Sequence, residues 1–436
     1  MNPCSEILLV ATVEEAELST RVAKNTGWLL LGRLGSQGLA LLFSIVIARR
    51  LGEVGLGQYA FIASVVYLGN LATTFGTDML IIREVAAKRD PTVLPASLIV
   101  QLALALPFIL LVFLLAPLIP NQTPDVIRAL YLYSLALLPL AAYSVFSAAL
   151  RGLERMAAFT WLNLFNGFLL AAAAWFFVQP GFSIEALAGL LLAVQLLSAL
   201  AAMLLFASHG RGLWSWQISW KTLAALLVAA APIAALGLLG ALYQRMGIYL
   251  LATLQGAAET GLFSAALRVV EAAKLGHFAL LGAVFPLMAQ AQAAPHPKFQ
   301  KLFAKTLKLL LLLAGALAVL LFLFSPALIP ILFGAEFSAS VPLLNILAWL
   351  LIPVTLTHYF SLMLLSAKKE KIIMLSLVVS LAALLTFVLL GLPAWGPAAV
   401  AWGLLLAESL QAAILVVYWL RNPPQKEFHA DPQLPR

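Results

Sequence analysis

The chain has little charge for its length. Of its 436 residues, only 10% are Asp, Glu, Lys or Arg, against about 25% in a typical soluble domain. Apolar residues make up 63%, and the mean hydropathy is +1.02, which requires apolar segments along nearly the whole chain. A soluble globular protein is therefore excluded, and the composition predicts a polytopic integral membrane protein.

Cysteine and catalytic motifs are also scarce. The only cysteine, Cys4, excludes an intrachain disulfide and a thiolate metal cluster. The five His are scattered, and neither Asp-x-Asp nor His-Glu-x-x-His occurs. A membrane enzyme needs placed acids, bases or metal ligands in a sizeable aqueous loop. We therefore expect a protein that is not an enzyme, with no catalytic residue, no metal and no cofactor.

Long apolar runs dominate what is present. A membrane helix needs about 20 apolar residues, and runs such as Leu309 to Phe324 are continuously apolar rather than alternating, which excludes a membrane β-barrel. The sequence predicts an all-α protein with about twelve transmembrane helices. They span approximately 26–48, 59–80, 96–119, 126–150, 157–178, 184–207, 222–251, 261–288, 302–324, 341–365, 372–390 and 397–420.

The distribution of basic residues predicts the orientation. Lys and Arg concentrate in short cytoplasmic loops. With the N-terminus inside, the inner segments collect most of the 26 basic residues, and the outer segments hold four: Arg49, Arg50, Arg128 and Arg245. Both termini are predicted to be cytoplasmic, in a cell inner membrane. Since the position of the charge matters more than its sum of +8, we expect no nucleic-acid partner.

An internal repeat divides the chain into two lobes. At an offset of 204, Gly52, Gly57 and Tyr59 align with Gly256, Gly261 and Phe263. A second, separate sequence similarity relates residues 116–120 to residues 326–330. Two six-helix lobes with a central cleft are predicted, related by an axis along the membrane normal. The predicted parts are a cytoplasmic extension (1–21), an N-lobe (22–207), a linker (208–221) that forms a helix at the inner membrane surface, a C-lobe (222–420) and a cytoplasmic tail (421–436).

Short motifs give a family resemblance. Asn25-Thr-Gly-Trp28, Gly55-Leu-Gly-Gln-Tyr59, Gly261-Leu-Phe-Ser-Ala-Ala266 and Phe333-Gly-Ala-Glu-Phe337 resemble the polysaccharide transporter family. These are the Wzx-type flippases for undecaprenyl-pyrophosphate-linked oligosaccharides, within the superfamily that includes lipid II flippases and multidrug extruders. Many relatives carry an acidic residue two places after the arginine of the seventh span. Here Gly247 follows Arg245 at that distance, so the resemblance gives no support for cation coupling at that position.

Charges within the predicted spans mark candidate site residues. A charge at the bilayer centre costs at least about 2.5 kcal/mol and needs a partner or a wet cavity. Arg268, Glu271 and Lys274 share one face of the eighth span, and Arg33 and Arg245 add two more cations near the cleft. These five residues either bind the pyrophosphate of an anionic cargo, or the first three form a self-neutralising ladder.

Three other residues within the predicted spans have separate possible roles. Asp78 either pairs with Arg33 or takes part in ion coupling, and Glu408 is either an inter-helix hydrogen-bonding group or a proton relay. Pro232 lies in the long seventh span, where it removes a backbone donor and allows a kink. It is therefore the candidate hinge.

The favoured function is a flippase that moves a lipid-linked oligosaccharide across the cytoplasmic membrane by alternating access. The alternatives are a lipid II-type flippase, or a cation-coupled drug extruder on the same fold, which would favour an acidic cleft. Expected partners are the lipid-linked substrate, membrane lipids, and the polymerase and glycosyltransferases of the same pathway.

Overall fold

The computed structural model describes residues 3–87, 90–210, 214–292, 296–367 and 369–422. These residues form helices joined by short connections, with no strand among them. The first half contains α1 (Pro3–Thr74), α2 (Thr77–Ala87), α3 (Val93–Leu115), the short 3-10 helix η1 (Ala116–Leu118), α4 (Pro124–Ser134), α5 (Leu137–Gly152), α6 (Met156–Phe177) and α7 (Ile184–His209). The second half contains α8 (Trp220–Leu254), α9 (Ala257–Gln292), α10 (His296–Phe333), the 3-10 helix η2 (Ala335–Ala339), α11 (Ser340–Ala348), α12 (Leu351–Ser366), α13 (Glu370–Trp395) and α14 (Pro397–Arg421).

The helices account for the predicted twelve spans. Within the described part of the chain, nine helices are long and apolar enough to cross a membrane, and the pair α11 and α12, bent by 41°, makes a tenth. One of the nine is the 51-residue stretch of α1 from Lys24 to Thr74, which is two helices joined at Gly52 (φ 69°). The helix α9, with 36 residues, is long enough to add a twelfth. The all-α fold class is confirmed.

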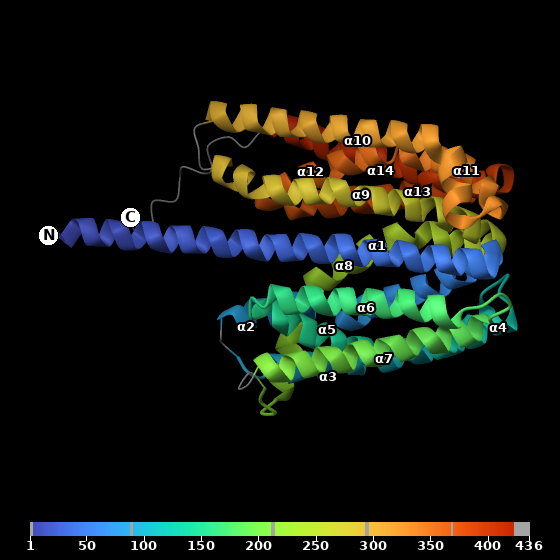
Figure 1. Ribbon diagram of the computed structural model, residues 1–436, viewed down its shortest axis with the longest axis horizontal. Coiled ribbons are helices and arrows are strands. Elements are labelled where there is room, and N and C mark those ends of the chain that lie inside the picture. Colours follow the sequence, from blue (N-terminus) through green and yellow to red (C-terminus); the bar gives the residue numbers. More distant parts are fainter. Residues whose placement is uncertain (1–2, 88–89, 211–213, 293–295, 368, 423–436) are drawn as a thin grey trace.

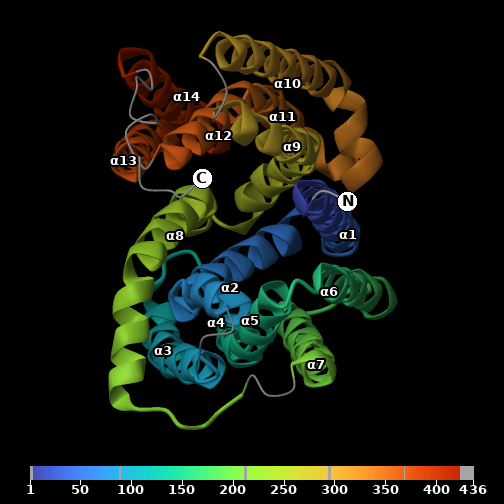
Figure 2. The ribbon, with the colours of Figure 1, turned by 90° about the vertical axis from the view of Figure 1, so that its left-hand side faces the viewer.

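The helices form two bundles (Figures 1 and 2). We call α1–α7 the N-terminal bundle and α9–α14 the C-terminal bundle. In Figure 2, α8 runs along one side of the molecule from the first bundle to the second. Its early residues Leu226 and Ala230 pack into a core of the N-terminal bundle, whereas Tyr243 and Ile248 belong to a core shared with the C-terminal bundle. Pro232 lies between these two segments.

The apolar core is shared by the bundles at one end only. The end that contains Gly52 and Gly334, on the right in Figure 1, has a single core with residues of both bundles, such as Ile47 and Phe263. Towards the opposite end the core divides. One cluster, which includes Leu94 and Leu150, lies in the N-terminal bundle, and another, which includes Tyr359 and Trp419, lies in the C-terminal bundle. We call these the closed end and the open end.

The outer surface of both bundles is apolar. Large side chains there keep about half or more of their surface exposed, including Leu114 (63%), Phe176 (71%), Leu323 (62%) and Leu390 (77%). In water, such continuous exposure would mark an association surface. On helices whose backbone bonds are satisfied internally, it is the surface expected to face lipid.

Two sequence predictions need correction. The described linker residues Trp214–Ser219 are not helical. Trp214 packs against the ring of Phe146 at 5.8 Å, and Ser215 donates its backbone N–H to the carbonyl of Pro91 at 3.1 Å. These described linker residues therefore pack against the N-terminal bundle. The second sequence similarity between the halves does not correspond to a similar structure, because residues 116–118 form η1 whereas residues 326–330 continue α10.

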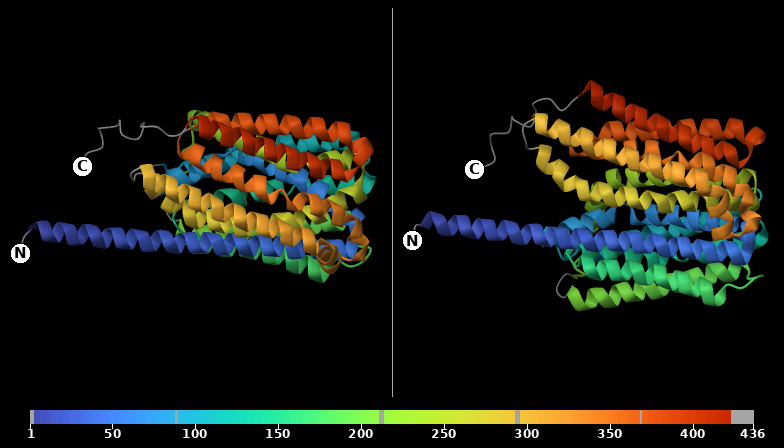
Figure 3. Two further views of the ribbon diagram at one scale, coloured as in Figure 1. Left: turned by 90° about the horizontal axis from the view of Figure 1, so that it is seen from above. Right: turned by 45° about the horizontal axis from the view of Figure 1, so that its top comes forward.

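The first repeat is reproduced in the backbone. Gly52 and Gly256 both have positive φ, 69° and 94°, a conformation that glycine adopts without steric cost. Each stands at the closed end, where one helix bends or ends and the next begins. The described residues of the N-terminal extension form the first part of α1. This part of the helix projects beyond the other helices (Figures 1 and 3).

Candidate functional site

A cavity of about 760 Å³ lies between the two bundles, within the range of typical ligand sites. Its lining comes from α1, α8, α9, α12, α13 and α14. Four cationic side chains and two carboxylates contribute to it: Arg33, Arg245, Arg268, Lys274, Glu271 and Glu408. The charged lining is therefore basic on balance, and this surface could attract an anion.

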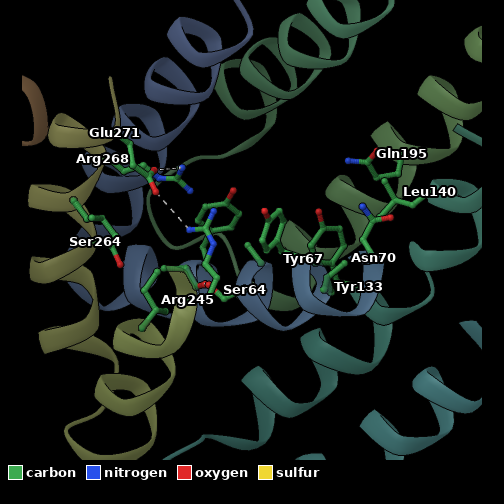
Figure 4. Close-up of a pocket in the computed structure, with 16 residues that line it drawn as sticks. Ser64, Tyr67, Asn70, Tyr133, Leu140, Gln195, Arg245, Ser264, Arg268 and Glu271 are labelled. Atoms are coloured by element: carbon green, nitrogen blue, oxygen red, sulfur yellow. Dashed lines mark hydrogen bonds and ion pairs between the residues drawn. The ribbon is translucent and has the colours of Figure 1, made fainter. Parts of the chain in front are cut away.

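A smaller cavity of about 240 Å³ adjoins the large one on the side of the N-terminal bundle (Figure 4). Tyr67, Arg245, Leu267, Arg268 and Glu271 line both cavities. These five side chains therefore form the boundary between the two spaces.

A carboxylate shared by two arginines stands at this boundary. Arg268 Nη1 lies 3.0 Å from Glu271 Oε2, one helical turn away on α9, and Arg245 Nη1 of α8 lies 3.8 Å from Glu271 Oε1. The two ion pairs are drawn as dashed lines in Figure 4. All three side chains are between 18% and 28% exposed. One negative charge cannot neutralise two positive ones, so this triad keeps a net positive charge facing the cavity.

Arg245 also contacts the N-terminal bundle. Its guanidinium carbon lies 4.9 Å from the centre of the Tyr67 ring on α1, a cation–π distance. Its buried Nε has no hydrogen-bond partner among the described residues. Arg245 therefore connects α8, α9 and α1 at one point while retaining an unused donor. It lies well inside α8 and not in an outer segment, which corrects the prediction from the distribution of basic residues.

The self-neutralising ladder is only half present. Its first pair, Arg268 with Glu271, forms, but the second contact of Glu271 is with Arg245 of the neighbouring helix. Lys274 lines the large cavity and makes no ion pair within 4.0 Å in the part of the chain described here. Gly247 packs closely on Val400, so a longer side chain would require this contact to shift.

Asp78 and Glu408 lie in different surroundings. Asp78 stands in the first turn of α2, where a carboxylate is stabilised by the helix dipole. The ion pairs found between described residues do not include one between Asp78 and Arg33, and the role of Asp78 stays a prediction. Glu408 is 6% exposed, and one of its oxygens accepts a hydrogen bond of 2.9 Å from the Tyr243 hydroxyl. This bond links α14 to α8 beside the large cavity.

Several lining residues were absent from the sequence predictions. Ser64, Tyr67 and Asn70 lie on one face of α1 and line the small cavity. Their three-residue spacing within an apolar span was a signal that could have identified them. Gln195 of α7 and His358 of α12, which line the small and the large cavity respectively, carried no such pattern.

Polar contacts join the bundles at the closed end. Gln122 donates to the carbonyl of Ala252 and Asn121 to that of Thr253, both at 2.8 Å. These carbonyls belong to the last turn of α8, where the carbonyl oxygens have no hydrogen-bond partner within the helix. Arg49 Nε donates to the carbonyl of Leu332 on α10 at 2.8 Å. In the part of the chain described, no group of three His, Cys, Asp or Glu side chains could hold a metal ion.

Two helical bundles around a polar cavity, with an apolar outer surface, are the architecture of a multi-pass membrane protein. The family model for polysaccharide biosynthesis proteins matches residues 22–292, more than half of the chain, and the protein belongs to this family. Its fold is similar to that of transporters of the MOP superfamily. A comparison with curated proteins finds no match.

Solved structures share the fold at low sequence identity. An inward-facing multidrug resistance MATE family transporter of the MOP superfamily aligns with a TM-score of 0.74 at 15% identity, over 88% of this chain and 94% of that chain. An outward-facing MATE transporter aligns with a TM-score of 0.66 at 14% identity, over 92% and 95%. A MOP superfamily transporter from Pyrococcus furiosus, whose binding pocket is described as having reverse polarity that suggests a different function, gives 0.66 at 15% identity, over 92% and 95%.

Proposed function

We propose that the protein moves an undecaprenyl-pyrophosphate-linked oligosaccharide from the inner to the outer leaflet of the cytoplasmic membrane. The observation that carries this proposal is the lining of the large cavity, where Arg33, Arg245, Arg268 and Lys274 face only two carboxylates. A guanidinium can donate two parallel hydrogen bonds to phosphate oxygens, and a lysine supplies a mobile point charge. A pyrophosphate is the part of the cargo that matches this set.

Glu271 holds the two arginines of the site in position. Its carboxylate forms ion pairs with both Arg245 and Arg268. Because each arginine has five donors in a fixed fork, a pyrophosphate can engage the donors that Glu271 leaves unused. Glu271 then remains as a second anion that limits how tightly the cargo binds, which favours release after transfer.

The orientation follows from the ends of the helices. Basic residues of the described chain cluster at the open end, including Arg151, Arg155, Lys305, Lys371 and Arg421, whereas the closed end carries Arg49, Arg50 and Arg128. By the positive-inside rule, the open end faces the cytoplasm. The two bundles then move relative to each other so that the cavity opens to the outside. Pro232 of α8 is the hinge, between the helix segments that pack on each bundle. The pathway's glycosyltransferases and polymerase would act before and after this step.

The polarity of the cavity also weighs against the alternative of a drug extruder. A carrier of organic cations would favour an acidic lining, because like charges repel the substrate. Here the cations outnumber the carboxylates. A lipid II-type cargo has the same pyrophosphate and remains the alternative within the flippase class.

Reconstitution tests the proposal. Proteoliposomes containing the full chain would be loaded with a fluorescent undecaprenyl-pyrophosphate oligosaccharide, and the fraction quenched by a membrane-impermeant reagent would be followed over time. We expect transfer of this lipid and none of a matched lipid in which a neutral group replaces the pyrophosphate. Equal transfer of both lipids, or of neither, would contradict the proposal.

A further inference from the structure

The small cavity differs chemically from the large one. Away from the triad it contains tyrosines and amides rather than charged groups: Tyr59, Tyr67, Tyr133, Asn70 and Gln195. In Figure 4, Arg268, Glu271 and Arg245 lie at one end and Asn70 and Gln195 at the other, with Tyr67 and Tyr133 between them.

Buried polar atoms in this cavity lack partners. The amide oxygens of Gln195 and Asn70 and the hydroxyl of Ser264 are buried and make no hydrogen bond among the described residues. Gln195 is 6% exposed and Ser264 is 3% exposed. Unsatisfied buried groups are costly, and a native structure retains them where a ligand or water supplies the missing bond.

The lining favours a neutral ligand that is rich in hydroxyl groups. Hydroxyls can donate to the free amide oxygens, and tyrosine rings offer apolar faces to the C–H groups of a sugar ring. An anion would find no cation beyond the triad, and a cation would find only Glu271, which already has two arginine partners. The volume of about 240 Å³ lies below the range of drug-sized sites and suits a single small ring.

The shared boundary of the two cavities determines which sugar of the cargo lies nearest to the small one. Arg245 and Arg268 line both spaces. A pyrophosphate bound to them from the large cavity would therefore hold its directly attached sugar next to the small one. We propose that the small cavity is a subsite for the neutral sugar ring linked to the pyrophosphate of the cargo. This inference rests on the proposed function and adds a separate site for the sugar.

Binding of two probes tests the subsite. The full chain in lipid nanodiscs would be titrated with undecaprenyl pyrophosphate and with undecaprenyl pyrophosphate that carries one hexose. We expect the sugar to tighten Kd about tenfold, the gain from one or two neutral hydrogen bonds. In Gln195→Leu this gain should be lost, while the Kd of the bare probe stays within about twofold of the wild-type value.

Gln101→Leu is the matched control. Gln101 is also a buried glutamine of the N-terminal bundle with an unpartnered Oε1, but it donates to Thr77 at 2.9 Å and lines neither cavity. This variant should keep the tenfold gain. Asn70→Leu provides a second test should Gln195→Leu fail to fold, and it should also lose the gain.

The outcomes separate the two proposals. Failure of the wild-type protein to bind the bare probe would contradict the proposed function itself. Binding of the bare probe with no gain from the hexose would overturn the subsite alone. Retention of the full gain in Gln195→Leu and Asn70→Leu would also overturn it, and would mean that the cavity holds only water.

Discussion

Gly57 of α1 and Gly261 of α9 lie at a close helix–helix contact where the two bundles meet at the closed end. A Cβ atom on Gly57 would stand 1.8 Å from the carbonyl oxygen of Ala257, and one on Gly261 would stand 1.9 Å from that of Glu53. The two contacts are equivalent in the internal repeat, since Glu53 corresponds to Ala257 as Gly57 does to Gly261. The helices can therefore approach this closely only because both positions are glycine.

Substitution of either glycine should open the closed end. The obstructing atoms are backbone, which cannot move aside as a flexible side chain can, so Gly57→Ala and Gly261→Ala must separate α1 from α9. We expect a loss of stability of about 1–3 kcal/mol, typical of overpacking, and a longer distance between spin labels placed on the two bundles at this end. Gly38→Ala is the control, because a Cβ there meets nothing within 4 Å. Unchanged label distances in both variants would contradict the tight crossing.

Removal of the shared carboxylate should destabilise the fold. Glu271→Gln leaves Arg245 and Arg268 near one another without a counter-ion. Breaking a fully buried ion pair lowers the free energy of unfolding by about 3–5 kcal/mol. The loss here should be smaller, because these side chains are 18–28% exposed. Thermal unfolding in detergent would measure the loss. The double variant Glu271→Gln with Arg268→Gln should recover most of it, and a double variant no more stable than the single one would refute the triad.

The sequence predicted the helices better than their contacts. Long apolar runs determine where spans begin and end, and the three-residue spacing of Arg268, Glu271 and Lys274 placed them on one face. The ion pair between Arg245 and Glu271 could not be predicted, because it joins two helices whose rotation depends on packing. The bond between Tyr243 and Glu408 was hidden for the same reason. The linker was predicted as a helix from its tryptophans, whereas Trp214 is held by the ring of Phe146.

The orientation can be tested with fusions. If both termini are cytoplasmic, a reporter that is active only in the periplasm should be silent after Arg436 and active after Gln179, which lies between α6 and α7 at the closed end. A cytoplasmic reporter at the same two sites should give the opposite pattern. Reversed activities would place the open end outside and contradict the proposed direction of transport.

Alternating access predicts opposite labelling of two cavity positions. In a Cys4→Ser background, Gln37→Cys reports on the large cavity and Ser264→Cys on the buried small cavity near the closed end. In the form described here, a thiol reagent should reach position 37 from the open end while position 264 stays protected from the closed end. Lipid-linked substrate should shift both rates in opposite directions. Equal labelling of both positions under every condition would indicate a continuous groove instead.

The rate at which Lys274 variants flip the fluorescent lipid-linked oligosaccharide tests the central claim most directly. Lys274 faces the large cavity and lies outside the triad, so its replacement should leave the fold intact. We predict that Lys274→Gln lowers the rate about tenfold, the loss expected for one charged hydrogen bond. Lys274→Arg should retain most of the activity, and Lys308→Gln, at an exposed position of α10, should be unaffected. Wild-type flipping by Lys274→Gln would contradict the claim that the cationic cavity binds the pyrophosphate.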